Sequence, residues 1–265
     1  MTRTPTRRRT AAVVASLLLA LPLAACSPGS SGSAGSEGSE GDGGDQQLVV
    51  LAASSLTEVV GTLSTTFEDQ HPGVTVTASF GSSTDLAEQA ADGAPGDVLA
   101  TADPTAMRVA QDAGVATDPQ AFAANTLTLV VPPDDPAGIG SLDDLAGTTW
   151  VRCADEVPCG RVALAVLSDA GVTAEPASLE EDVKSALEKV TSGEADAALV
   201  YASDAVAAGD AVRAIPVPDA QREATTYLTA TLEQAASPDL ARDWNDLLLS
   251  EQGREVLQAA GFTVQ

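Results

Sequence analysis

Two clusters of hydroxyl side chains follow segments that have the pattern of buried strands. Ser54 and Ser55 come directly after an apolar run, and Ser82 and Ser83 follow a run in which apolar and polar residues alternate. A helical pattern begins after each cluster. The first N–H groups of a helix have no partner within it and carry about half a positive charge. Two such helix starts facing one cleft would bind an anion without any basic side chain.

The first cluster also has a purely structural interpretation. Ser55 and Glu58 have the S-x-x-E spacing of a capping box, in which each side chain accepts a hydrogen bond from the other residue's backbone N–H. Capping and anion binding are compatible uses of the same residues. We therefore predict a capping box at Ser55 and leave its part in binding open.

The order of the elements predicts an α/β fold. Strand-like runs alternate with segments whose apolar residues recur at helical spacing, and this alternation is typical of doubly wound sheets. Ligands bind such sheets at the carboxyl ends of the strands. We expect strands at 47–53, 73–80, 97–102, 126–132, 148–153, 195–202, 211–217 and 225–232. We expect helices at 56–67, 83–93, 103–114, 160–171, 179–193, 240–249 and 253–260.

Residues 1–46 have the composition of an export signal and a tether. Four arginines, an apolar stretch and the tetrapeptide "LAAC" at 23–26 predict a lipoprotein signal peptide over 1–25, with a membrane-anchor helix as the alternative. Cys26 would carry the lipid that holds the protein at the outer face of the cell membrane. Residues 26–46 are rich in Gly, Ser and acidic residues, which predicts a flexible tether. The export route, general or twin-arginine, stays open.

Charge and composition exclude several classes of protein. The 265 residues carry a formal charge of −25, and removal of the signal peptide leaves nine basic and 38 acidic side chains. Nucleic acid is excluded as a partner because phosphate contacts need a basic surface. An enzyme is disfavoured because His71 is the single histidine and no catalytic motif is present. A lipid-anchored structural or adhesive protein is a further, weaker alternative.

Cys153 and Cys159 are the two cysteines beyond the signal region. In an exported protein such a pair tends to oxidise, so we expect a disulfide, with free thiols as the alternative. A metal site is less favoured because His71 lies far from the pair in the sequence.

Several blocks of the sequence resemble the periplasmic molybdate-binding proteins in order and spacing. They are "AASSLTEV", "SFGSSTDLAEQ", "GAPGDVLATAD", "EVPCGR", "EDVKSAL", "LVYASDAV" and the closing "GFTV", within residues 48–265. The resemblance implies the type II periplasmic-binding-protein fold: two α/β lobes, each a doubly wound sheet, with the ligand cleft between them. It places lobe 1 at 47–126 and 227–265, and lobe 2 at 127–226.

The resemblance also implies the ligand contacts. The hydroxyls of Ser55, Ser83 and Tyr201 and the main-chain N–H groups of Cys159 and Val183 would surround a tetrahedral oxyanion. Cys159 stands where many relatives carry Ala, a change that keeps the N–H but allows the disulfide to alter the local turn. Without the resemblance, Tyr201 would be an ordinary core residue with a buried hydroxyl.

The function implied is capture of molybdate or tungstate and delivery to a membrane permease of the ATP-binding-cassette type. The protein would be a monomer, without catalytic activity, cofactor or bound metal cation. Sulfate or another tetrahedral oxyanion is the alternative ligand. A site made only of donors suits molybdate and sulfate, which carry no proton at neutral pH, whereas phosphate retains one and would require an acceptor.

Overall fold

The computed structural model describes residues 46–264. The predicted signal peptide at 1–25, the lipidation at Cys26 and all of the tether except Gln46 lie outside the described residues. The first strand begins at Gln46, one residue before the expected start of the folded part. Within 46–264, no helix combines the length and the apolar character needed to cross a membrane.

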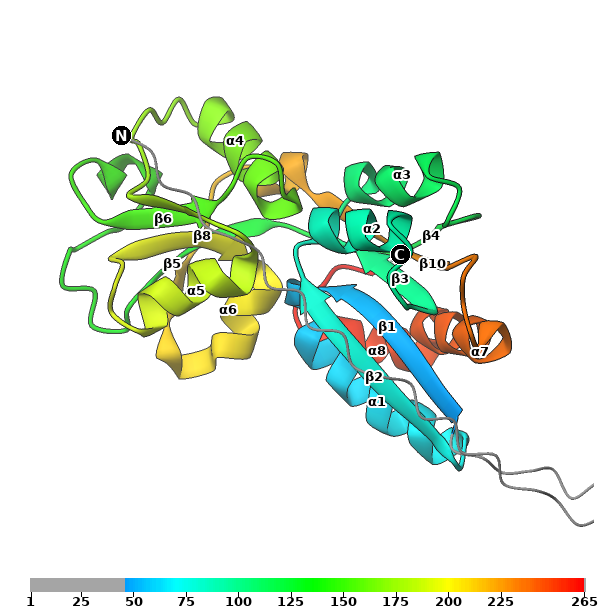
Figure 1. Ribbon diagram of the computed structural model, residues 1–265. Helices are drawn as coiled ribbons and strands as arrows, with labels where there is room; N and C mark the ends of the chain where they lie inside the picture. The colour runs from blue at the N-terminus through cyan, green and yellow to red at the C-terminus, as the bar shows by residue number, and fades with distance from the viewer. Residues whose placement is uncertain (1–45, 265) are drawn as a thin grey trace, which may run out of the picture. The chain divides into compact units, whose positions relative to one another are not determined.

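Lobe 1 is built on a five-stranded sheet with the order β2-β1-β3-β10-β4. β1 pairs in parallel with β2 and β3, whereas β10 is antiparallel to both of its neighbours. The strands are β1 (Gln46–Ala53), β2 (Val74–Gly81), β3 (Val98–Thr101), β4 (Gln120–Asn125) and β10 (Thr225–Thr231). The helices of this lobe are α1 (Thr57–Gln70), α2 (Ser83–Ala91), α3 (Pro104–Asp112), α7 (Pro238–Leu249) and α8 (Glu251–Ala259) (Figure 1).

Lobe 2 repeats this topology with the sheet order β7-β6-β8-β5-β9. Its strands are β5 (Leu127–Val131), β6 (Trp150–Cys153), β7 (Ser178–Glu180), β8 (Ala197–Tyr201) and β9 (Arg213–Ile215). Its helices are α4 (Pro158–Asp169), α5 (Val183–Thr191) and α6 (Ala202–Ala208). Short 3-10 turns lie at Ser54–Leu56, Leu142–Leu145, Gly209–Ala211 and Ala220–Glu223.

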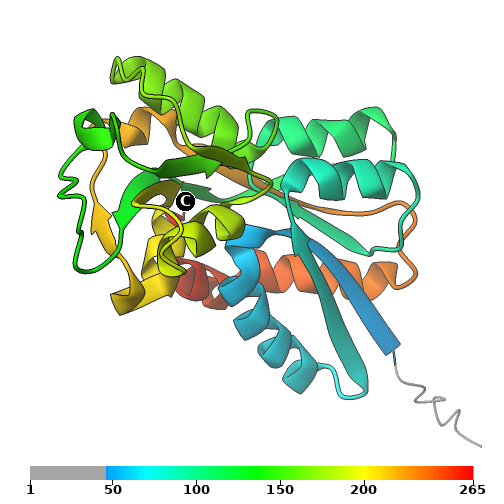
Figure 2. The same ribbon diagram turned by 60° about the vertical axis from the view of Figure 1, so that its left-hand side comes forward.

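The chain passes between the two sheets twice. Thr126 alone separates β4 of lobe 1 from β5 of lobe 2, and the segment after β9 leads back to β10 of lobe 1 (Figure 2). β10 begins at Thr225, two residues before the boundary expected at 226/227. Because β10 lies between β3 and β4, the returning strand is an inner strand of its sheet.

Three local expectations differ from the structure. The expected helix over 179–193 is wrong at its start, because Ser178–Glu180 pairs with β6 as a strand and the helix begins only at Val183. Asp182 sets that start by accepting a hydrogen bond from the Ser185 N–H at 2.9 Å. β4 and α6 were not expected, since both are rich in alanine and have little apolar periodicity.

Four of the eight aromatic residues gather where the lobes meet. The Tyr227 ring in β10 packs edge-on against Phe262, Phe122 and Tyr201, with centroid separations of 5.2, 6.0 and 6.0 Å. Tyr201 comes from β8 of lobe 2, whereas the other three belong to lobe 1. This aromatic cluster therefore joins the core of one lobe to the strand end of the other.

Candidate functional site

Ser55 lies in a 3-10 turn between β1 and α1. The predicted capping box is wrong, because α1 begins only at Thr57 and the residue before it, Leu56, gives no side-chain cap. The turn moves the helix start past Ser55 and buries this serine, which is 2% exposed. Its hydroxyl instead lies 2.8 Å from the Tyr227 hydroxyl, 172 residues away in the sequence.

Ser83 is the first residue of α2, and Ser82 before it is the cap, accepting from the Asp85 N–H at 3.5 Å. Ser83 Oγ accepts a hydrogen bond from the Ala102 N–H at 2.9 Å. An N–H group can only donate, so this contact leaves the serine's own proton unused. The buried hydroxyl of Ser83 therefore still has a hydrogen to donate.

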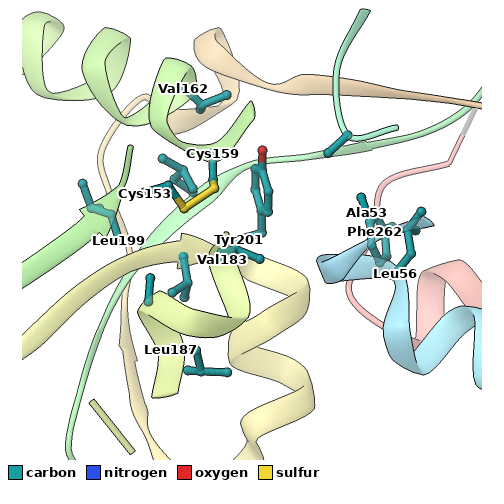
Figure 3. Packing of buried hydrophobic residues seen from close by; sticks show 14 of the residues in the cluster. Ala53, Leu56, Cys153, Cys159, Val162, Val183, Leu187, Leu199, Tyr201 and Phe262 are labelled. Atoms are coloured by element: carbon teal, nitrogen blue, oxygen red, sulfur yellow. A yellow bond between two sulfur atoms is a disulfide. The ribbon is translucent and has the colours of Figure 1, made fainter. Parts of the chain in front are cut away.

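Cys153 at the end of β6 and Cys159 near the start of α4 form a disulfide, with 5.7 Å between their Cα atoms. Pro158 is the first residue of α4 and has no N–H, so the Cys159 N–H is the first of that helix. It has no acceptor within the helix. Figure 3 shows the disulfide beside the ring of Tyr201, with Val183 on the neighbouring helix.

Val183 occupies the equivalent place in α5, as its first residue. The Asp182 carboxylate bonds the N–H of Ser185 and not that of Val183. The Val183 N–H is thus another helix-start donor, and its side chain is buried in the core of lobe 2.

Tyr201 is the last residue of β8 and is 1% exposed. Among residues 46–264 its hydroxyl has no hydrogen-bond partner. Burial is the main cause that raises the pKa of this phenol well above its ordinary value, and the nearby Tyr227 acts in the same direction. The hydroxyl therefore keeps its proton at physiological pH, and a buried hydroxyl without a partner is costly unless a ligand accepts from it.

The structure brings all five predicted residues to one pocket: Ser55, Ser83, Cys159, Val183 and Tyr201 line it together. The cavity volume is about 10 Å³, close to the least space that holds one water-sized group. The starts of α2, α4 and α5 converge on it. Helix N-termini and hydroxyl donors are groups that bind an anion, and the small volume excludes an extended organic ligand. A larger hollow of about 430 Å³ beside Ser141 and Arg222 is lined by several carboxylates and is unsuited to an anion.

Sequence reasoning missed the ion pairs that join the lobes beside this pocket. Arg161 in α4 contacts Asp103, the cap of α3, at 2.7 Å. Lys184 in α5 contacts Glu58 in α1 at 2.8 Å and the buried Asp204 of its own lobe at 3.3 Å. No local signal could reveal these pairs, because they join residues distant in the sequence. Each positive charge faces a carboxylate, so the donors left for a ligand are neutral.

Asp204 is a fully buried carboxylate that contacts Lys184 beside the site. Burial raises the pKa of Asp204 to about 6, while the ammonium group of Lys184 lowers it. Contacts with Asp204 and Glu58 raise the pKa of Lys184 despite its own partial burial, which acts in the opposite direction. An exposed pair such as Lys184–Glu58 contributes about 0–1 kcal/mol, so it aligns the lobes without locking them together.

Comparison with known proteins identifies a family and a relative that both bind solutes. Residues 48–263 match the family described as "Bacterial extracellular solute-binding protein". The molybdate-binding protein ModA of Mycobacterium tuberculosis (strain ATCC 25618 / H37Rv) is 36% identical over 220 residues, which cover 82% of this chain and 84% of that protein.

Two solved structures share the fold. The periplasmic molybdate-binding protein of Azotobacter vinelandii has a TM-score of 0.72 at 20% identity, covering 82% of this chain and 99% of that one. The sulfate-binding protein SubI from Mycobacterium tuberculosis H37Rv has a TM-score of 0.71 at 19% identity, covering 82% and 86%. These structures confirm the expected two-lobed α/β fold but do not distinguish one oxyanion from another.

Gly160 offers a test of how tightly the start of α4 is held. A Cβ added there would lie 1.7 Å from the Ala154 carbonyl oxygen, inside the loop that the disulfide closes. Either this loop or the helix start must move, so we expect Gly160→Ala to lower the free energy of unfolding by about 1–3 kcal/mol or more. Because the neighbouring Cys159 N–H moves with the helix, anion affinity should fall as well. Urea unfolding and calorimetric titration with molybdate measure the two effects.

Gly61→Ala is the matched control, since Gly61 lies in α1 and an added Cβ would meet nothing within 4 Å. That change should raise stability by about 0.5–1 kcal/mol through helix propensity and leave affinity unchanged. If Gly160→Ala and Gly61→Ala had the same stability and the same anion affinity, the close approach of α4 to Ala154 would be contradicted.

Proposed function

Because this chain belongs to the bacterial extracellular solute-binding proteins, we propose that it captures molybdate or tungstate outside the cytoplasm and delivers the anion to an importer of the ATP-binding-cassette type. The resemblance to periplasmic molybdate-binding proteins noted in the sequence is confirmed by the relative that is 36% identical and carries that name. The name of this relative supports the proposal, and the donors that line the pocket support it independently.

The observation that carries the proposal is that helix-start N–H groups and hydroxyl donors from both lobes line one pocket. Ser83 receives a hydrogen bond from Ala102 and so directs its own proton elsewhere. Tyr201 keeps its proton and has no partner among the described residues. The carboxylate that lines the pocket, Asp182, accepts from Ser185. An anion whose oxygens carry no proton can accept from all of these donors.

The remaining parts of the proposal follow from the export signal and the family. The protein would be held at the membrane by a lipid on Cys26 and would meet its permease there. It would act as a monomer, binding and releasing its ligand unchanged, with no cofactor and no catalytic step. Tungstate has the same tetrahedral arrangement of oxygens as molybdate, and we propose that both bind.

Sulfate is the second candidate ligand, because the fold is equally similar to that of a sulfate-binding protein. It is also a tetrahedral dianion without a proton. We favour molybdate because the 36% sequence identity is to a molybdate-binding protein, whereas the sulfate-binding structure is 19% identical.

Calorimetric titration of the exported protein with four anions tests the ligand. We expect tight binding of molybdate and tungstate, far weaker binding of sulfate, and weaker binding of phosphate than of molybdate, since the proton on phosphate opposes the donors that line the pocket. Sulfate binding equal to or tighter than molybdate binding in a competition titration would replace molybdate with sulfate as the ligand.

Ser83→Ala removes one donor to a charged ligand, a hydrogen bond with a net contribution of about 1.5–3 kcal/mol. Molybdate affinity should fall roughly 10- to 150-fold. Stability should fall too, because the buried Ala102 N–H loses its acceptor. Ser250→Ala is the control: it removes a hydroxyl that caps α8 outside the pocket, and should change stability but not affinity. If Ser83→Ala loses stability but keeps affinity, Ser83 has only a structural role.

The five residues proposed to contact the anion come from both lobes, so we expect the lobes to close on the ligand. Ser55 and Ser83 belong to lobe 1, whereas Cys159, Val183 and Tyr201 belong to lobe 2. An anion that contacts both lobes binds the closed state more tightly and shifts the population toward it. Solution scattering from a protein that lacks residues 1–45 should show a smaller radius of gyration with molybdate than with the same concentration of chloride. Identical profiles from saturated and ligand-free protein would exclude a closing clamp.

A further inference from the structure

Tyr227 occupies the centre of the aromatic cluster and reaches a residue of the pocket. It lies in β10, the strand by which the chain returns to lobe 1, and is fully buried. Its hydroxyl is 2.8 Å from Ser55 Oγ. Tyr227 itself does not line the pocket, so any effect it has on a ligand must pass through a neighbour.

The contact between two hydroxyls uses one of their two protons. An oxyanion offers only acceptors, so the Ser55 proton can reach it only if Tyr227 is the donor in the Ser55–Tyr227 hydrogen bond. Ser83 meets the same requirement through the Ala102 N–H, which can only donate. Ser55 depends on a hydroxyl that can act in either direction, so a ligand that accepts from Ser55 decides the direction.

The anion sets that direction. The Tyr227 hydroxyl is fully buried, and it lies 2.8 Å from Ser55 Oγ. When an anion accepts the Ser55 proton, Ser55 Oγ can only accept in its contact with Tyr227, so the Tyr227 hydroxyl must be the donor. Burial raises the pKa of Tyr227, so this proton is present throughout the physiological range.

We infer that Tyr227 is a positioning residue for the anion site: it donates to Ser55 Oγ and thereby turns the Ser55 proton toward the ligand. The inference rests on the proposed function and extends it from the residues that touch the anion to one that acts through Ser55. A directional series results, from Tyr227 to Ser55 to the anion, in which each group donates to the next.

A double-mutant cycle on molybdate affinity tests the inference. Tyr227→Phe keeps the ring and its packing and removes only the hydroxyl, so the Ser55 proton is no longer directed. We expect calorimetric titration of the full chain to show molybdate binding weakened about 2- to 12-fold, the range of one neutral hydrogen bond. In a Ser55→Ala background, the same Tyr227→Phe change should alter affinity by less than about twofold, because no serine hydroxyl remains to be directed.

The cycle separates the inference from both a structural role and the proposed function. If Tyr227 only supports packing, Tyr227→Phe lowers affinity equally in both backgrounds, and the inference is overturned. Wild-type affinity in Tyr227→Phe alone, or in Ser55→Ala alone, overturns it as well. Failure of the wild-type protein to bind molybdate would instead overturn the proposed function. Thermal unfolding without ligand shows whether each variant is folded at the titration temperature.

Discussion

The hydrogen bond from the Ala102 amide to Ser83 Oγ illustrates the constraint on which this structure depends: a pocket that holds an anion with neutral groups must aim every polar hydrogen inward. A hydroxyl both donates and accepts, so it serves this purpose only when the protein occupies its acceptor side. Ala102 does so for Ser83, and Tyr227 is placed to do so for Ser55. The main-chain N–H groups of Cys159 and Val183 need no neighbouring donor to orient them, because an N–H group can only donate.

The same constraint explains how a chain with a formal charge of −25 can hold a negative ion. The basic side chains closest to the pocket are already paired, Arg161 with Asp103 and Lys184 with Glu58 and Asp204. Attraction must then come from helix N-termini, whose dipoles act over the first turn. Surface carboxylates are screened beyond about 8–10 Å, so they oppose binding only weakly. A ligand held this way is bound by neutral donors and not by a cationic side chain.

A disulfide and packing contacts fix the strand ends and turns that carry these donors. The Cys153–Cys159 disulfide ties the end of β6 to the start of α4, and the Gly160 backbone packs against the Ala154 carbonyl where any side chain would clash. A loop this short gains less stability from cross-linking than a long one. Its effect is instead local, because it fixes the turn that presents the Cys159 N–H. On the other side, the aromatic cluster around Tyr227 joins the end of β8 to lobe 1 while the backbone crosses between the lobes at Thr126.

The sequence by itself determined the α/β alternation, the repeated arrangement of hydroxyls after strands, and the cysteine pair, because each depends on residues near one another along the chain. The resemblance of short blocks to a known family added Cys159, Val183 and Tyr201, which no local pattern marks as ligand contacts. Local reasoning was wrong at Ser55, where a 3-10 turn replaces the expected capping box, and at Leu179, where pairing with β6 replaces the expected helix.

Only the tertiary structure decided which way each donor points. Ser55 meets Tyr227 across 172 residues, Lys184 meets Glu58 across 126, and Arg161 meets Asp103 across 58. The direction of a hydroxyl proton is set by the partners that packing brings beside it, and those partners come from strands and helices that are neighbours in space alone. Residue type determines that a serine can donate a hydrogen bond, but the fold determines which group accepts it.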